Sequence, residues 1–151
     1  MKLSPHFDLQ EFLHTSRAEL LASQGQEVKN YIPSLKALCL YILEPIREFY
    51  NAPVIISSGF RGKSLNTAVG GSATSQHSLG QAADITVKGI DPAQIIKDIK
   101  TKKLSFHFGQ CIFEKIGGKE WVHISLGYPF RLDKPNMQIL QTLDGKNYTE
   151  V

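Results

Sequence analysis

The sequence predicts an α+β fold, with a mainly antiparallel sheet flanked by helices. Two observations lead to this class: helical patterns fill the N-terminal part of the chain, and short strand patterns with interspersed helices follow. A doubly wound fold would require regular alternation of strand and helix throughout. A length of 151 residues suits one hydrophobic core, so we expect a single domain over residues 1–151.

The first predicted element is a short helix over residues 9–14. Asp8 followed by Glu11 forms a capping-box pattern, in which each side chain can bind the backbone amide of the other end. Phe7 and Phe12 flank this pattern as a hydrophobic staple. Both signals place the start of the helix at Asp8.

A longer helix is predicted from Pro33 to Phe49. Its apolar residues recur at three- and four-residue steps, which is typical of one buried helix face. They are Leu35, Leu38, Cys39, Ile42, Leu43, Ile46 and Phe49. Pro45 lies inside this pattern and should kink or divide the helix. Before it, residues 15–33 are mixed, and only a turn of helix is expected, at Ala18–Ser23.

Two strands are predicted in the middle of the chain, at Val54–Ser58 and Ala82–Val87. Alternation along the second strand places Asp84 on the face opposite its apolar residues. The segment between the strands should contain a short helix, Ser64–Val69, and a polar loop, Ser72–Gly80.

The last predicted elements are one helix and two hairpins. Asp91 and Pro92 are typical of a helix start, and this helix should run to about Lys102. Glycines mark both hairpin turns. The strand pairs are Gln110–Lys115 with Glu120–Leu126, and Gln138–Leu143 with Tyr148–Val151.

Composition excludes several classes of function. The net charge of +3 is small, and no basic cluster is interleaved with aromatic residues, so we do not expect nucleic-acid binding. No run of about 18 apolar residues is present, which argues against a membrane span. The N-terminus lacks a signal-peptide pattern, so we expect a cytoplasmic protein or one released by a route not encoded here. We expect a monomer, with Cys39 and Cys111 as buried free thiols because both lie in apolar runs.

Four residues offer the groups of a hydrolytic zinc site: His77, Asp84, His123 and Glu120. Catalytic zinc takes three protein ligands, keeps one position open and works with a carboxylate that carries protons. Asp84 needs a partner, because an unpaired carboxylate in an apolar strand is costly to bury. If the strands of Asp84 and His123 are neighbours, these two side chains can meet across them.

A catalytic role for Glu120 depends on the geometry of its strand. It precedes His123 by three residues, so a regular strand would place the two side chains on opposite faces. We therefore predict a turn or bulge at Glu120. A straight, fully paired ladder there would count against a catalytic role for this residue.

The motifs resemble those of the M15 zinc peptidases. The segment from Ser75 to Asp84 carries the whole SxHxxGxAxD signature, and Glu120-Trp121-Val122-His123 matches the second signature of that family. Ser58-Gly59-Phe60-Arg61 matches its Ser-Gly-Tyr-Arg segment with Phe in place of Tyr, and Leu43–Glu48 is similar to the preceding helix. The resemblance covers roughly residues 7–126.

The resemblance implies a fold shared with hedgehog signalling domains and D-alanyl-D-alanine peptidases. It implies one Zn²⁺ per chain, bound by His77, Asp84 and His123, with Glu120 as the catalytic base and Arg61 as a contact to substrate or transition state. The implied reaction is hydrolysis of peptide bonds in peptidoglycan or its stem peptides, of the D,D-carboxypeptidase or endopeptidase type.

Three further residues are expected near this site. Ser75 should orient the loop or the substrate, and Ser125 should support the ligands. Trp121 should form either a pocket wall or part of the core. One position departs from the family: Gly109 stands where many members carry aspartate, which could alter the polarity of the pocket without touching the metal.

Several alternatives stay open at this point. The chain could be a non-catalytic zinc-binding module of the hedgehog type, or an amidase that cuts the link between sugar and peptide. The choice between exo- and endopeptidase depends on closure of the pocket, for which residues 15–33 and 127–136 are the candidate loops. Bacterial wall remodelling and phage-type lysis are both compatible with the motifs.

Overall fold

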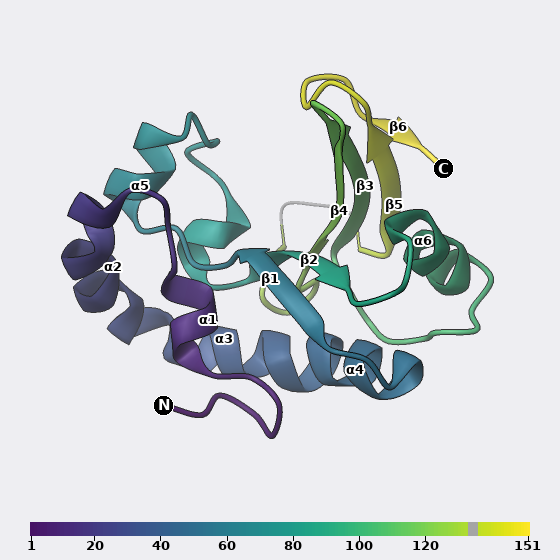
Figure 1. Ribbon diagram of the computed structural model, residues 1–151, viewed down its shortest axis with the longest axis horizontal. Helices are drawn as coiled ribbons and strands as arrows, with labels where there is room; N and C mark the ends of the chain where they lie inside the picture. The colour runs from purple at the N-terminus through teal and green to yellow at the C-terminus, as the bar shows by residue number, and fades with distance from the viewer. Residues whose placement is uncertain (133–135) are drawn as a thin grey trace.

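The computed structural model describes residues 1–132 and 136–151, and this part of the chain forms a six-stranded sheet with helices packed against it (Figure 1). The strand order is β1-β2-β4-β3-β5-β6. Their bounds are β1 Val54–Ser58, β2 Ala82–Val87, β3 Gln110–Ile116, β4 Lys119–Ser125, β5 Gln138–Thr142 and β6 Thr149–Glu150. Only β3 and β5 pair in parallel among the described strands, so the predicted α+β fold with a mainly antiparallel sheet is confirmed.

The first helix, α1 (Leu9–Leu13), begins as predicted. The Gln10 amide donates to the Asp8 carboxylate at 3.1 Å, and the Asp8 amide donates to the Glu11 carboxylate at 2.8 Å. Phe7 and Phe12 are both buried. This cap fixes α1 beside the end of β1, where the Phe60 amide donates to the Phe12 carbonyl at 2.9 Å.

The segment after α1 is more helical than the sequence suggested. A 3₁₀ turn (η1, Ala18–Leu20), α2 (Leu21–Glu27) and a second 3₁₀ turn (η2, Val28–Tyr31) follow one another. The reason is a tertiary contact: the side-chain amide of buried Gln24 donates to the Phe60 carbonyl at 2.8 Å and accepts from the Gly62 amide at 2.5 Å. Helix α2 thus holds both neighbours of Arg61.

The long helix runs through Pro45 without a break (Figure 1). It consists of α3 (Ile32–Leu38), a π-helical stretch (η3, Cys39–Leu43) and α4 (Glu44–Tyr50). A proline has no amide hydrogen and crowds the preceding turn. The wider π turn immediately before α4 accommodates Pro45, so the expected kink or division is replaced by a local change of helix type.

The helices cover one face of the sheet. The apolar residues of α3, η3 and α4 share a core with Ile85 on β2, Val122 and Ile124 on β4, and the buried side of α6 (Pro92–Lys100). The other face of β2 and β4 carries Asp84 and His123, as the alternation predicted. Helix α5 (Lys63–Ala68) and the turn η4 (Gln76–Leu79) lie beside this second face.

The two predicted hairpins are present. Gly117 and Gly118 have φ angles of 58° and 78°, as a type I′ turn between β3 and β4 requires. The second hairpin, β5 with β6, extends the sheet by parallel pairing with β3, a partner the sequence did not identify. None of the helices in the described residues is long and apolar enough to cross a membrane.

Both cysteines are free and buried, which confirms the expectation for Cys39 and Cys111. Burial raises the pKa of the Cys39 thiol to about 12. The pKa of Cys111 is raised further for the same reason.

Glu44 joins the N-terminal segment to the start of α4. Its carboxylate accepts from the Ser4 hydroxyl at 2.6 Å and from the His6 amide at 2.8 Å, and its other oxygen lies 2.6 Å from Nδ1 of His6. Burial alone would raise the pKa of Glu44, but these hydrogen bonds outweigh it and hold the pKa below the ordinary value of 4.5.

We expect Glu44→Gln to lower the free energy of unfolding at pH 7 by about 1–3 kcal/mol, because charge-assisted hydrogen bonds are lost. A carboxylate whose pKa is lowered by folding stabilises the protein above its unfolded pKa. This contribution is lost as the pH falls from 4.5 through the folded-state value. The difference between wild type and variant, measured by urea unfolding, should therefore shrink between pH 7 and pH 3.

Glu48→Gln is the matched control, since Glu48 lies exposed on the same helix. It should leave the free energy of unfolding within about 0.5 kcal/mol of wild type at both pH values. An equal loss of unfolding free energy in both variants would show that Glu44 stabilises the protein only through its negative charge, and not through its hydrogen bonds.

Candidate metal centre

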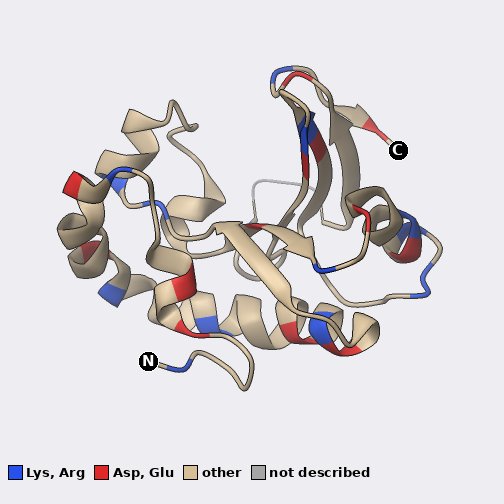
Figure 2. Ribbon diagram, viewed as in Figure 1, with Lys and Arg blue, Asp and Glu red and all other residues tan. Residues whose placement is uncertain are grey.

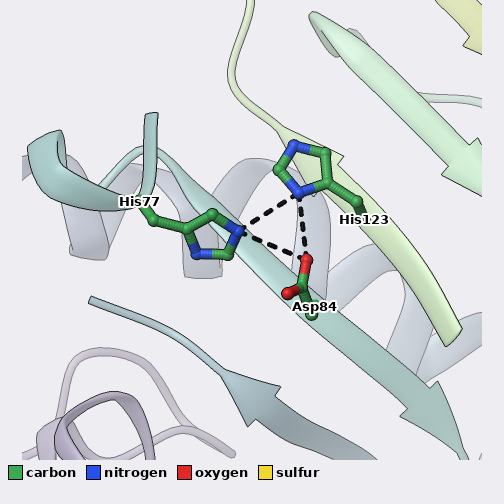
Figure 3. Close-up of side chains that lie close together, drawn as sticks. All are labelled: His77, Asp84 and His123. Carbon is green, nitrogen blue, oxygen red and sulfur yellow. Dashed lines mark hydrogen bonds and ion pairs between the residues drawn. The ribbon is translucent and has the colours of Figure 1, made fainter. Parts of the chain in front are cut away.

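The neighbouring elements η4 and β2 and the more distant strand β4 bring His77, Asp84 and His123 together (Figure 3). Asp84 on β2 pairs directly with His123 on β4, because the two strands are antiparallel neighbours. His77 reaches the same point from η4, the short turn before β2. The convergence expected from the motifs is therefore present in the structure.

The three facing atoms form a small triangle. Nε2 of His77 lies 3.2 Å from Nδ1 of His123 and 3.3 Å from Oδ1 of Asp84, and the third side measures 3.0 Å. Zinc binds nitrogen and oxygen at about 2.0–2.2 Å, so two ligand atoms of a tetrahedral ion lie about 3.3–3.4 Å apart. The triangle matches this spacing after a small expansion, and its donor types are those that zinc uses in catalytic sites.

The backbone orients the His77 ring. Its Nδ1 lies 2.7 Å from the Gly59 carbonyl, which can only accept, so Nδ1 carries the hydrogen and Nε2 is left with a free electron pair. Glycine at position 59 also lets Phe12 pack closely against this segment, because a Cβ atom there would lie 2.7 Å from Cα of Phe12. The Ser75 hydroxyl accepts from the His77 amide at 3.3 Å and so caps the turn that carries His77.

Electrostatics favour an ionised Asp84. Burial would raise the pKa of this carboxyl, but the nearby His77 and His123 rings lower it well below its usual range. His77 is almost fully buried, at 2% exposure of its side chain, whereas the other two residues remain partly open to solvent. An anionic oxygen and two imidazole nitrogens, open on one side, are a suitable set for a divalent cation.

The triangle lies in a cleft of about 870 Å³. One wall comes from the segment from Val69 to Gln76, and the other from β3 and β5 with Tyr148. A neighbouring hollow of about 350 Å³, which includes His14 and Ser57, shares Arg61 and Val69 with this cleft. Figure 2 shows acidic and basic residues interspersed over the helices and hairpins, which agrees with the small net charge of +3.

Arg61 lies at the junction of the two hollows. One of its guanidinium nitrogens donates to the Ser75 hydroxyl at 3.3 Å, while Nε is buried and has no partner within the described residues. Burial lowers the pKa of Arg61, and the charges of Asp84 and Glu114 oppose that effect. A partly buried guanidinium group in the cleft lining is suited to bind an anionic or carbonyl oxygen of a ligand.

Trp121 and Ser125 take different places. Trp121 lines the cleft, and its buried Nε1 has no hydrogen-bond partner in the described part of the chain. Ser125 is fully buried, and its hydroxyl accepts from the Gln110 amide at 3.0 Å. Ser125 therefore holds the start of β3 against the end of β4.

The predicted turn or bulge at Glu120 is wrong. Glu120 pairs with Lys115 in a regular ladder that runs to the hairpin turn, so its side chain leaves β4 on the face opposite to His123. There it forms an ion pair with Lys115 at 3.2 Å. Because the strand is straight and fully paired at Glu120, its side chain points away from His123, which argues against a catalytic role for Glu120.

Glu114 is the carboxylate that the sequence reasoning missed. It lines the cleft and pairs with Trp121 across the hairpin, so it shares the face of His123. Burial and then the charge of Asp84 raise the pKa of Glu114, and His123 and Arg61 act in the opposite direction. Counting outward from the Gly117-Gly118 turn would have paired Glu114 with Trp121 and revealed its position.

Gly109 also has a structural role in this chain. A Cβ atom there would lie 2.6 Å from the Leu126 carbonyl oxygen, and the Gly109 amide donates to the Ser125 carbonyl at 2.7 Å. The close approach of two backbones, rather than pocket polarity, accounts for glycine at this position.

Of the two loops expected to close the pocket, residues 15–33 are largely helical, and the second loop includes 133–135, which lie outside the described residues.

The family comparison agrees with this geometry. The model of the Peptidase M15 family matches residues 5–125 of the chain. This protein therefore belongs to the M15 peptidases, a class of metalloenzymes. A search among curated proteins finds no significant match.

We expect Asp84→Asn to lower bound zinc from about one equivalent to well below half, because a neutral amide is a much weaker ligand than a carboxylate. Metal content is measured after dialysis at equal protein concentration. Asp91→Asn is the control, since Asp91 is exposed and its side chain makes no cap hydrogen bond. Zinc at wild-type stoichiometry in Asp84→Asn would remove Asp84 from the ligand set.

Proposed function

We propose that this protein is a zinc-dependent peptidase that hydrolyses peptide bonds in peptidoglycan or its stem peptides. The observation that carries the proposal is the triangle of His77, Asp84 and His123, open on one side at the floor of a cleft. Membership of the M15 peptidases supports a peptidase reaction.

His77, Asp84 and His123 would hold the ion. With it bound, the site would gain a Lewis acid that polarises a carbonyl and lowers the pKa of water toward about 7. The protein's own contribution is to fix the ligand directions: the Gly59 carbonyl sets the His77 ring, and the sheet register sets Asp84 against His123. The three-ligand set favours catalysis over a purely structural role, which usually takes four protein ligands.

Arg61 is proposed to bind the substrate carbonyl oxygen and to stabilise the negative charge that develops there. Its partly buried position strengthens such an interaction, because water screens it less there than at an exposed site. The Ser75 hydroxyl helps to position the guanidinium group. Trp121 is proposed to contact the ligand as part of the cleft wall.

The shape and lining of the cleft support a peptide as substrate. Gln110 and Gln138 lie in the cleft wall and can pair with peptide groups, and their side chains are joined at 2.9 Å. The neighbouring hollow continues past Arg61, which provides room for a chain longer than a dipeptide. These features suit a cross-linked wall peptide better than a free dipeptide.

The decisive experiment is digestion of purified peptidoglycan with zinc-loaded protein, followed by mass spectrometry of the released fragments. We expect new amine and carboxyl ends within the stem peptides, and no release after treatment with a chelator. Fragments cut between sugar and peptide would instead identify an amidase. Zinc binding without any cleavage would identify a non-catalytic module and would reject the proposal.

We expect Arg61→Met to lower kcat/KM by about 10²–10³-fold, because a donor to the developing oxyanion is removed. Bound zinc should be unchanged, since Arg61 is not one of the clustered ligands. Arg17→Met is the matched control, because Arg17 is exposed and forms an ion pair with Glu19 at the surface, at 2.8 Å. A variant at Arg61 with wild-type kcat/KM would exclude the proposed contact.

A further inference from the structure

The cleft contains a carboxylate with no assigned task in the proposed reaction. Glu114 stands on β3, on the face that carries Asp84 and His123. Asp84 is committed to the metal cluster, so Glu114 is the acidic group of the described cleft lining that remains available. Peptide hydrolysis needs such a group, because a proton must leave the water and reach the departing nitrogen.

The register of the hairpin places Glu114 within reach of the cluster. Ile112 pairs with His123, and Glu114 pairs with Trp121, so Glu114 is the diagonal neighbour of His123 across two strands. Diagonal neighbours lie about 7–8 Å apart, a distance that long side chains span. Glu114 can thus approach the open side of the triangle.

The surroundings of Glu114 suit a group that both accepts and returns a proton. No described residue donates a hydrogen bond to its carboxylate. The groups that act on it are Asp84 from β2, His123 from β4 and Arg61 from the opposite wall, with Tyr148 as a further neighbour. A partly buried carboxylate without a fixed partner is free to bind water.

We propose that Glu114, and not Glu120, carries the proton in peptide hydrolysis; this inference rests on the proposed function. As the water oxygen bonds to the carbonyl carbon, one water proton moves to the Glu114 carboxylate. The carbon–nitrogen bond then breaks, and the proton moves from Glu114 to the leaving nitrogen. The products are a carboxyl group and an amine, and no electrons are exchanged with another reagent.

Glu120 provides the matched comparison within the same hairpin. It is also a strand glutamate, but its side chain leaves the opposite face and binds Lys115. Glu114→Gln and Glu120→Gln remove the same charge by the same isosteric change. Only the first should affect the chemistry.

We expect Glu114→Gln to lower kcat on peptidoglycan by about 10²–10⁴-fold and to keep wild-type zinc content, whereas Glu120→Gln keeps kcat within about threefold. The inference is overturned if Glu114→Gln turns over like wild type, or if only Glu120→Gln loses activity. Loss of zinc from Glu114→Gln would overturn it too, because Glu114 would then act on the metal site itself.

A second measurement does not depend on the substrate. Acetohydroxamic acid binds zinc as its anion and passes its proton to a nearby base, so its affinity reports that base. We expect about tenfold weaker binding to zinc-loaded Glu114→Gln and unchanged binding to Glu120→Gln, as loss of a charge-assisted hydrogen bond implies.

These two measurements separate the two proposals. If wild type cleaves no peptidoglycan, the proposed function fails, and hydroxamate binding still tests Glu114. Equal hydroxamate affinity in wild type and Glu114→Gln would reject Glu114 as the base whether or not peptidoglycan is cleaved.

Discussion

The antiparallel pairing of β2 with β4 is the constraint on which the site depends. It sets Asp84 directly opposite His123, and their side chains leave the sheet on the face opposite to the core that α3, η3 and α4 cover. A shift of one residue in this register would turn one of the two side chains into the core. The next pair in the same ladder, Ile85 and Val122, is apolar and fully or almost fully buried, so the core itself holds the register.

The N-terminal helices hold His77 and Arg61 in place. The end of β1 is held from one side by Phe12, whose carbonyl accepts from the Phe60 amide, and from the other by Gln24. The Gly59 carbonyl can then orient His77, and the Arg61 amide donates to the His77 carbonyl at 3.1 Å. The helices before β1 therefore act on the site through hydrogen bonds to the backbone of the segment that follows β1.

Local patterns in the sequence were sufficient for much of the fold. The cap at Asp8, both central strands and the Gly117-Gly118 turn depend on neighbouring residues, and all were predicted. Features that depend on distant contacts were not. The helices after Thr15 form because Gln24 binds the β1 end, and β5 finds β3 across the hairpin.

The site shows the same division between local and distant information. The motif spacing brought His77, Asp84 and His123 together correctly, since each residue type carries its own chemical signal. A turn or bulge at Glu120 was predicted to reconcile its place in the motif with strand alternation, and the regular pairing of Glu120 with Lys115 contradicts it. Glu114 could have been found only by extending the hairpin register inward from the turn, which the sequence reasoning did not do.

The two buried thiols can report local opening of the protein, because each must become exposed before a reagent can label it. Only the thiolate reacts with disulfide reagents, and burial suppresses that form at both Cys39 and Cys111. Cys39 belongs to the π-helical stretch, and Cys111 to the strand that leads to Glu114. Labelling rates in the unmodified chain therefore time the opening of the helical layer and of the sheet separately, with no engineered probe.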